Sequence, residues 1–387
     1  MSSGNEMSEL SNERETKSER WREVLEEFAR YRFADTLSDD LSIMEKVYYS
    51  IHGSGYKYLF LPDKRALKFI SARIRYHQAL KNRLAVVCLS MLPLIPQKIV
   101  VLPKTKIVCS KKLSEVVGEL IIISGTRMKF FNFNTGRLYT LPLRHVHAER
   151  LKTEVEIRKK LENKINIPRI IYYDSKFPYV VEEIVGYPLY SLDEKSWPHI
   201  VDVFRQLIEY YKENGIEPVS AEKKISEIKL NLQKASLKNE YLEILHKFIK
   251  ILKNYSCKDF FTTLTHGDIY LGNLVTDGKK IYITDWDFPR ERLITSDLVY
   301  LLFRYYIDSG KSEVMNALLA GKNNLHRKYI LEILKKFDRS FNIGISDENV
   351  LRCYTIIGIL ERIPLFESDP LQNLIFKRLQ KILQLIQ

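Results

Sequence analysis

The sequence predicts an α+β protein of two lobes, the first rich in β-strands and the second helical, with an N-terminal extension before them. Short runs of β-branched and aromatic residues, separated by Gly and Asn turns, fill residues 98–186 as in an antiparallel sheet. Helical periodicity prevails over residues 187–387. One predicted hairpin interrupts it at residues 260–287 and carries a cluster of His, Asp and Asn side chains. We therefore expect an extension at residues 1–97, a β-rich lobe after it, and a helical lobe from residue 187.

The extension combines a polar start with two helical patterns and one strand. An amphipathic helix is predicted over Trp21–Phe33 and a strand over Tyr56–Leu61. A long basic helical pattern follows over Arg65–Leu92 and ends in an almost wholly apolar run. Residues 64–95 therefore suit a peripheral contact with an anionic membrane surface. The alternative, which we favour, is a helix packed against protein with its charges in solvent.

The β-rich lobe is predicted from strand signals on either side of short turns. The turns Gly125-Thr126 and Asn134–Gly136 separate the first three strands, and a helix follows them. The expected elements are strands Leu120–Ser124, Arg127–Phe133 and Arg137–Leu143, a helix Glu149–Leu161, and strands Pro168–Tyr173 and Tyr179–Ile184. A linker at Gly186–Leu189 then leads into the helical lobe.

The helical lobe contains the predicted hairpin between two groups of helices. Helices are expected over Ile200–Gly215 and Ala221–Tyr255, and the chain after Asp297 is helical as far as Leu371–Ile386. The hairpin is predicted from the Asp277-Gly278 turn between two short apolar strands.

The residues around this hairpin have the spacing of a phosphoryl-transfer site. Asp268 and Asn273 are five residues apart, and Asp285 follows twelve residues later. In such sites an Asp accepts the proton of the substrate hydroxyl, and an Asn and a later Asp hold Mg²⁺, which prefers hard oxygen ligands. The hairpin should bring Asn273 and Asp285 to the same end of the strand pair. The alternative is an ordinary hairpin in which Asp and Asn only form turns.

These motifs resemble those of the aminoglycoside phosphotransferase and choline kinase superfamily, a branch of the protein-kinase-like fold. His266-Gly267-Asp268 stands where protein kinases have His-Arg-Asp, and Asp285-Trp286-Asp287 where they have Asp-Phe-Gly. The likeness is strong over residues 260–303 and fair over 116–190. It implies a two-lobed protein-kinase-like fold, with a β-rich N-lobe and a helical C-lobe. It further implies an ATP- and Mg²⁺-dependent kinase that acts on a hydroxyl of a small molecule, such as a sugar, an amino alcohol or a glycolipid precursor.

The resemblance also assigns roles to individual residues. Asp268 would be the catalytic base, Asn273 and Asp285 the metal ligands, and Asp287 a second metal contact. His266 and Asp297 would give structural support. The residues expected to bind the nucleotide are Gly125, Thr126, Lys129, Glu154 and Glu182.

This chain departs from the family pattern at one position, the lysine of the third strand. That position falls on Thr140, so the helix residue Glu154 is expected to lack its cationic partner. Lys129 or Arg144 is expected to meet the nucleotide phosphates instead. We favour activity because all three oxygen-bearing residues are present. The alternative is a catalytically weak or inactive nucleotide-binding module.

Composition sets limits on the class of protein. The chain has 387 residues, of which 45% are hydrophobic and 28% charged, and carries a net charge of +13. No apolar run is long enough to span a bilayer, and the four cysteines form no CxxC pair, so we expect a cytoplasmic protein, in part at the inner membrane face. No zinc spacing or RNA-recognition signature accompanies the charge, so no nucleic-acid partner is expected.

Overall fold

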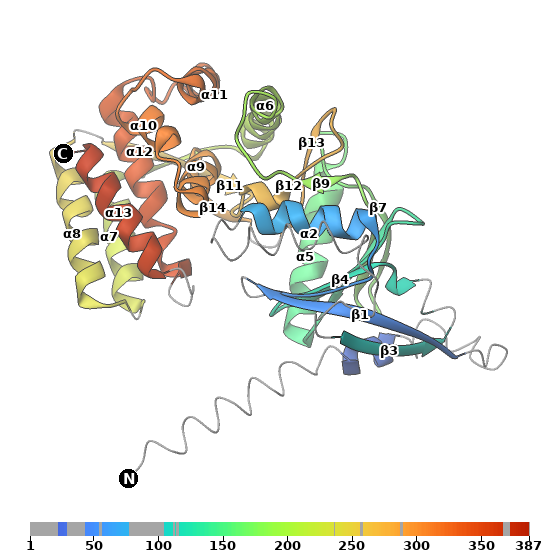
Figure 1. Cartoon of the computed structure of the whole chain (residues 1–387). Helices are drawn as coiled ribbons and strands as arrows, with labels where there is room; N and C mark the ends of the chain where they lie inside the picture. Colours follow the sequence, from blue (N-terminus) through green and yellow to red (C-terminus); the bar gives the residue numbers. More distant parts are fainter. Residues whose placement is uncertain are drawn as a thin grey trace, which may run out of the picture. The chain divides into compact units, whose positions relative to one another are not determined.

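The computed structural model of the chain describes residues 22–28, 43–53, 56–76, 104–110, 113, 116–235, 237–255, 258–286, 289–366 and 372–386. The chain divides into two compact units, coloured by sequence in Figure 1. Unit 1 consists of Met1–Ile74, Arg83–Lys159 and Pro168–Val185, and unit 2 of Arg75–Asn82, Lys160–Ile167 and Gly186–Gln387. The β-rich unit thus precedes most of the helical unit along the chain, which is the order that the sequence predicts.

Unit 1 is built on a sheet of eight strands in the order β3-β1-β2-β4-β5-β6-β8-β7, and every pairing in it is antiparallel. The strands are β1 (Ile43–Gly53), β2 (Tyr56–Phe60), β3 (Lys104–Ser110), β4 (Leu120–Ile123), β5 (Arg127–Asn132), β6 (Arg137–Pro142), β7 (Ile170–Asp174) and β8 (Tyr179–Glu183). Strand β2 pairs with β4, so the segment expected as an extension continues the sheet of the β-rich lobe.

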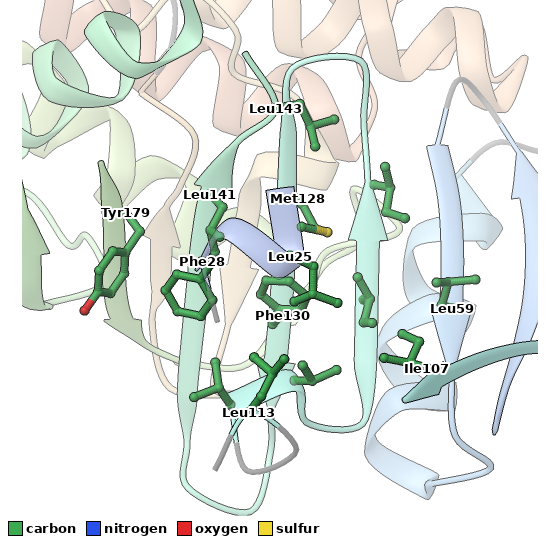
Figure 2. Close-up of a cluster of buried hydrophobic side chains, with 14 of the residues drawn as sticks. Leu25, Phe28, Leu59, Ile107, Leu113, Met128, Phe130, Leu141, Leu143 and Tyr179 are labelled. Atoms are coloured by element: carbon green, nitrogen blue, oxygen red, sulfur yellow. The ribbon is translucent and has the colours of Figure 1, made fainter. Parts of the chain in front are cut away.

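The core of unit 1 lies on one face of this sheet. Leu25 and Phe28, in the helical residues 22–28, pack with Met128 and Phe130 of β5 (Figure 2). Lys129 is not part of that cluster and is partly exposed. Met128 and Phe130 therefore lie on one face of the sheet and Lys129 on the other, as the alternation of side chains along a strand requires.

Helix α2 (Lys64–Tyr76) has its apolar side against the same sheet. The ring of Phe69 lies 4.5 Å from that of Phe131, and Arg65 Nη1 donates to the Phe133 carbonyl at 2.9 Å. The part of the basic helical pattern that the structure describes thus packs against protein, the interpretation we favoured. Residues 77–92 lie outside the described part, and a membrane contact through residues 64–95 stays a prediction.

Helix α5 (His145–Leu161) belongs to unit 1 except for its last two residues, and helices dominate unit 2. The helices are α5 (His145–Leu161), α6 (Trp197–Asn214), α7 (Ala221–Lys234), α8 (Asn239–Asn254), α9 (Ser296–Ser309), α10 (Glu313–Leu319), α11 (Leu325–Phe341), α12 (Glu348–Leu360) and α13 (Gln372–Ile386), with short η3 (Leu271–Asn273) and η4 (Ile363–Phe366). No helix in the described residues combines the length and apolar character that crossing a bilayer requires.

The single helix predicted over Ala221–Tyr255 is wrong, because the structure has two. Ala235 and Lys238 both take extended backbone conformations, which end α7 and precede α8. No Gly or Pro marks this break in the sequence. Helix α7 packs on β10 (Glu217–Ser220) and β11 (Asp259–Thr265), whereas α8 packs on α12 and α13, and one straight helix would not meet both sets of partners.

Two small sheets complete unit 2 and carry the predicted hairpin. One has the order β10-β11-β14, where β14 is Arg290–Leu293, and the other the order β13-β12-β9. In the second sheet β12 (Leu274–Thr276) pairs with β13 (Ile281–Ile283) and with β9 (Tyr187–Pro188). The hairpin at Asp277-Gly278 is therefore confirmed.

Candidate active site

The hairpin brings Asn273 and Asp285 to the same end of the strand pair. Leu274 pairs with Ile283, and one step beyond that pair the Thr284 N–H donates to the Asn273 carbonyl at 2.9 Å. Asp285 comes next and has a φ of +66°, so the backbone turns away from the strand direction at this residue. Asn273 and Asp285 therefore follow the same end of the strand pair.

The amide of Asn273 has a defined orientation. Its Nδ2 lies 3.0 Å from the Asp268 carbonyl and 3.1 Å from Asp268 Oδ2, and both of these atoms can only accept. The amide nitrogen must face them, which turns Oδ1 away from Asp268. Since Asn273 is 1% exposed, this orientation is held by the surrounding structure. Oδ1 is thus the atom available to a cation.

Asp268 carries a perturbed carboxyl group. Burial in the loop raises its pKa to about 6, and the neighbouring Asp285 carboxylate acts in the same direction. Arg362, a hydrogen bond from Tyr300 and the charge of Arg304 oppose that rise. A carboxyl group with a pKa near neutrality is suited to accept a proton.

His266 is fully buried beneath this loop and has a defined tautomer. Its Nδ1 accepts from the Asp268 N–H at 3.2 Å, so the proton is on Nε2, which lies 3.1 Å from the Thr284 carbonyl. The ring also meets Trp286 edge-on, with centroids 4.5 Å apart. His266 therefore connects the Asp268 loop to the strand that leads to Asp285.

Asp297, at the start of α9, holds the same loop from another side. Its carboxylate accepts from the N–H groups of His266 at 2.9 Å and Gly267 at 3.0 Å, and from the Tyr211 hydroxyl at 2.7 Å. Asp297 is completely buried. A buried carboxylate that accepts three hydrogen bonds holds this loop firmly, because losing the donors would leave an unpaired charge in the interior at a large cost in free energy.

Two buried arginines complete the support of the loop, and no sequence motif identified them. Arg292 Nη1 donates to the Gly267 carbonyl at 2.7 Å, and Arg362 Nη1 donates to the same oxygen. Burial lowers the pKa of Arg292 to about 10, and the charge of Arg362 adds to that shift. Tyr300, in contrast, could have been found from the sequence, because Asp297, Tyr300 and Arg304 recur at helical spacing on one face of α9.

In unit 1, the prediction that Glu154 lacks a cation is wrong. Arg127, the first residue of β5, donates from Nη1 to Glu154 Oε2 at 2.5 Å, and both side chains are buried. Arg158, one turn further along α5, lies 3.5 Å from the other carboxylate oxygen. A search confined to the third strand and its Thr140 misses Arg127, because it lies on the neighbouring strand beside the turn.

Lys129 lies on the same face of the sheet as Arg127. It stands directly opposite Thr140, and Thr140 stands opposite Val180. Directly paired residues point to the same side of a sheet, and Val180 packs against α5 on that side. Lys129 is thus one strand away from the position where Thr140 replaces the expected lysine. Arg144, the other candidate cation, is exposed just before α5.

Glu182 is engaged in a buried network of charges. Its Oε2 accepts from Arg158 Nη1, and Arg158 Nη2 donates to the Pro168 carbonyl at 2.7 Å. Arg127, Glu154, Arg158 and Glu182 thus alternate in charge across β5, α5 and β8. Their burial makes this network a fixed part of the unit. A nucleotide contact of Glu182 stays a prediction.

The turn between β4 and β5 uses some of its backbone donors internally. Ser124 Oγ accepts from the N–H groups of Arg127 at 2.9 Å and Thr126 at 3.3 Å. A Cβ added at Gly125 would meet no atom within 4 Å, so packing does not require glycine here. A turn that cradles phosphates directs its N–H groups outward. For the Thr126 N–H to do so, the Ser124 side chain would have to rotate away.

The metal ligands predicted from the sequence form a small oxygen set. Among the described residues, no group of three or more His, Cys, Asp or Glu side chains has the geometry of a metal site. Of the predicted metal ligands, the structure describes Asn273 and Asp285, whereas Asp287 lies outside the described residues. One or two protein oxygens are nevertheless the usual protein share of a Mg²⁺ site that is completed by phosphates and water. The donor set therefore fits Mg²⁺ bound together with a nucleotide.

Comparison with known proteins gives similarity to solved structures only. No protein-family model matches the chain, and no curated protein matches it by sequence. A putative aminoglycoside phosphotransferase from Ralstonia eutropha aligns at 12% identity over 67% of this chain and 87% of its own, with a TM-score of 0.47.

Two further structures have comparable values. A thermostable mutant of aminoglycoside phosphotransferase APH(4)-Ia aligns at 13% identity over 67% of this chain and 90% of its own, with a TM-score of 0.43. Amicoumacin kinase in complex with AMP-PNP and Ca²⁺ aligns at 12% identity over 67% and 84%, with a TM-score of 0.41. At these values the likeness concerns the course of the chain and carries nothing about substrate or residue roles.

Proposed function

We propose that the protein is an ATP- and Mg²⁺-dependent phosphotransferase that acts on a hydroxyl group of a small molecule. Asp268 is the base that orients the acceptor hydroxyl and takes its proton. Asn273 Oδ1 and the Asp285 carboxylate would hold Mg²⁺, which when bound neutralises charge on the transferred phosphoryl group. The acceptor class proposed is a sugar, an amino alcohol or a glycolipid precursor.

The observation that carries this proposal is the coupling of Asp268 to Asn273. One amide group bonds the proposed base through Nδ2 and presents Oδ1 on its other side. An ordinary hairpin turn would not need an asparagine buried between a carboxylate and a second acidic residue. The fixed supports at His266 and Asp297 hold the loop in this arrangement. Such preorganisation is what a reaction that depends on positioning requires.

For nucleotide binding, we propose that two cationic residues of unit 1 have different roles. Arg127 neutralises Glu154 and so fixes α5 against the sheet. Lys129, partly exposed and directly opposite Thr140, meets the phosphates. A triphosphate without a cationic partner would be costly in a partly dehydrated site, so one such residue is needed.

A second candidate function is a nucleotide-binding module with little or no turnover. The observation that favours it is the Ser124 side chain, which occupies two of the donors in the turn proposed to cover the phosphates. Measuring Mg·ATP binding by calorimetry and phosphoryl transfer to an acceptor panel separately would distinguish the two. Binding without turnover on any acceptor favours the module.

The experiment that tests the leading proposal replaces the base. Asp268→Asn keeps the shape and the Asn273 contact on one oxygen, and should lower kcat by about two to four orders of magnitude with Mg·ATP binding retained. Asp259→Asn, an exposed carboxylate at the start of β11, is the matched control and should leave kcat unchanged. If Asp268→Asn keeps more than roughly a tenth of the turnover, Asp268 is not the base.

A further inference from the structure

Arg362 is the most deeply buried cation near the proposed base and comes from a distant part of the chain. It lies two residues beyond the end of α12, immediately precedes η4, and is 0% exposed. Removing a guanidinium from water costs several kcal/mol, and an apolar side chain of the same volume would often serve packing as well or better. Its partners therefore indicate what its charge and shape are for.

Three contacts of Arg362 converge on the loop of the proposed base. Nη1 donates to the Gly267 carbonyl, the residue immediately before Asp268. Nη2 lies 3.9 Å from Asp297 Oδ1, the carboxylate that binds the loop N–H groups. The guanidinium carbon lies 4.2 Å from the centre of the Tyr300 ring, and Tyr300 is close enough to Asp268 to lower the pKa of its carboxyl group. The guanidinium thus contacts the loop backbone, the carboxylate that supports the loop, and the phenol ring beside the base.

The surrounding charges make this position hard to explain by packing alone. Arg292 donates to the same carbonyl oxygen as Arg362, and each cation makes the other less favourable. Carboxylates compensate them. Asp297 lies between the two, and Glu361 beside them is held by Lys224 Nζ at 2.7 Å. Two guanidinium groups on one peptide oxygen fix the plane of that peptide, because each donor approaches along its own direction.

From this geometry we infer that Arg362 is a positioning residue: it fixes the Gly267 peptide and, through Tyr300, the carboxylate of Asp268. The consequence for phosphoryl transfer rests on the proposed function, whereas the effect on the loop does not. The C-terminal part of the chain then contributes directly to the site, since the connection between α12 and η4 supplies one support of the loop. Arg362 touches no substrate in this assignment.

The competing explanation is a purely structural role, in which Arg362 only compensates buried polar groups. Both explanations predict that Arg362→Met destabilises unit 2, because Gly267 and Asp297 lose a partner. The two explanations make different predictions for the folded Arg362→Met variant. A positioning role predicts that the loop becomes locally mobile and that catalysis falls, while a structural role predicts that all of unit 2 loosens equally.

The test combines Arg362→Met with a conservative variant and a matched control. Arg362→Lys keeps the charge and one donor to the Gly267 carbonyl, but cannot also lie flat on Tyr300 and reach Asp297. The control is Arg378→Met in α13, whose guanidinium carbon lies 5.1 Å from the Tyr306 ring on the same helix as Tyr300. It removes the same kind of contact on α9 at a residue that forms no hydrogen bond with the loop.

Hydrogen exchange of the backbone amides in residues 264–270 is the first readout, measured without nucleotide or acceptor. Arg362→Met should speed exchange at His266 and Gly267 by at least about tenfold beyond its effect on the rest of unit 2, and Arg362→Lys by less. Arg378→Met should leave the loop unchanged. Equal acceleration throughout unit 2, or no change in the loop, overturns the inference.

Separate kcat and KM values are the second readout. Both Arg362 variants should lower kcat by about ten- to a hundredfold while the acceptor KM changes little, as expected when an indirect support of a reacting group is lost. If wild-type protein shows no turnover on any acceptor, the proposed function fails, and the exchange result still decides the role of Arg362. Wild-type kcat in Arg362→Met with a mobile loop would overturn the catalytic consequence.

Discussion

Arg127 and Lys129 show how two residues on one strand take different roles. Arg127 is buried and paired with Glu154, whereas Lys129 on the same face is partly exposed. A buried ion pair is strongly destabilising when one partner is removed, because the other charge is left in the interior. An exposed lysine contributes little to folding. Substitution of Arg127 should therefore change the free energy of unfolding, and substitution of Lys129 should change nucleotide binding.

The corresponding prediction compares Arg127→Met with Lys129→Ala. Arg127→Met should lower the free energy of unfolding by about 3–5 kcal/mol, since it removes the guanidinium 2.5 Å from the buried Glu154 carboxylate, whereas Arg158 lies 3.5 Å away. Lys129→Ala should change stability by less than about 1 kcal/mol and weaken Mg·ATP binding severalfold. Chemical denaturation and calorimetry measure the two effects. Normal ATP affinity in Lys129→Ala would leave Arg144 or a catalytically silent protein.

A second prediction at the residue scale concerns the metal. Asp285→Ala should weaken Mg·ATP binding and turnover together, because it removes the carboxylate that we propose as a metal ligand at the end of the hairpin. Asp287→Ala should matter less, since it is proposed only as a further contact. Titrating Mg²⁺ against both variants checks the order. A larger defect in Asp287→Ala would mean that the two ligands are exchanged.

At the scale of elements, the sequence predicts structure that neighbouring residues determine, and does not predict contacts between residues far apart in the chain. The hairpin was predictable because Asp277-Gly278 sets both the turn and the register that brings Asn273 to Asp285. The Arg362 contact with Gly267 joins residues 95 positions apart, and nothing in a single sequence pairs them. The break between α7 and α8 was missed for the same reason, since packing against other elements produces it rather than a Gly or Pro.

A prediction for an element follows from Gly186, which leads into β9 beside the hairpin. A Cβ at Gly186 would lie 2.0 Å from the Thr276 carbonyl oxygen, and φ there is +155°. Gly186→Ala should thus force β9 away from β12 and cost more than about 3 kcal/mol of unfolding free energy. Gly278→Ala is the control, with φ +92° and no atom within 4 Å. It should cost only about 1–2 kcal/mol, the strain of a left-handed residue.

Equal stability losses in the two glycine variants would mean that the contact of Gly186 with Thr276 is not tight. A loss confined to Gly186→Ala should also reduce turnover, because β12 continues directly from Asn273. Measuring kcat alongside denaturation therefore tests whether the small sheet β13-β12-β9 holds the proposed metal ligands in place.

At the scale of the whole molecule, unit 1 depends on residues that the sequence alone assigned to an extension. Leu25, Phe28, Tyr48 and Leu59 are all within the core cluster that also contains Met128 and Phe130 (Figure 2). Strand patterns at residues 43–60 carry no sign of which sheet they join, and the pairing of β2 with β4 decides that. The fold class was predictable from periodicity, whereas membership of a shared core was not.

The last prediction tests that dependence by truncation at residue 98, where the extension was expected to end. The truncated chain loses the four core side chains Leu25, Phe28, Tyr48 and Leu59, which are each at most 5% exposed. Full burial of such a side chain is worth about 1.5–3 kcal/mol, so the loss of four exceeds roughly 6 kcal/mol and approaches the whole stability of a domain. Truncation also uncovers the edge of β4, which invites aggregation. We therefore expect unit 1 to lose its cooperative unfolding in a chain of residues 98–387. Hydrogen exchange of the β5 and β6 amides measures this loss. Removal of residues 1–21 alone keeps all four core side chains and serves as the control. Native-like protection of β5 and β6 in the chain that begins at residue 98 would establish the extension as a separable domain.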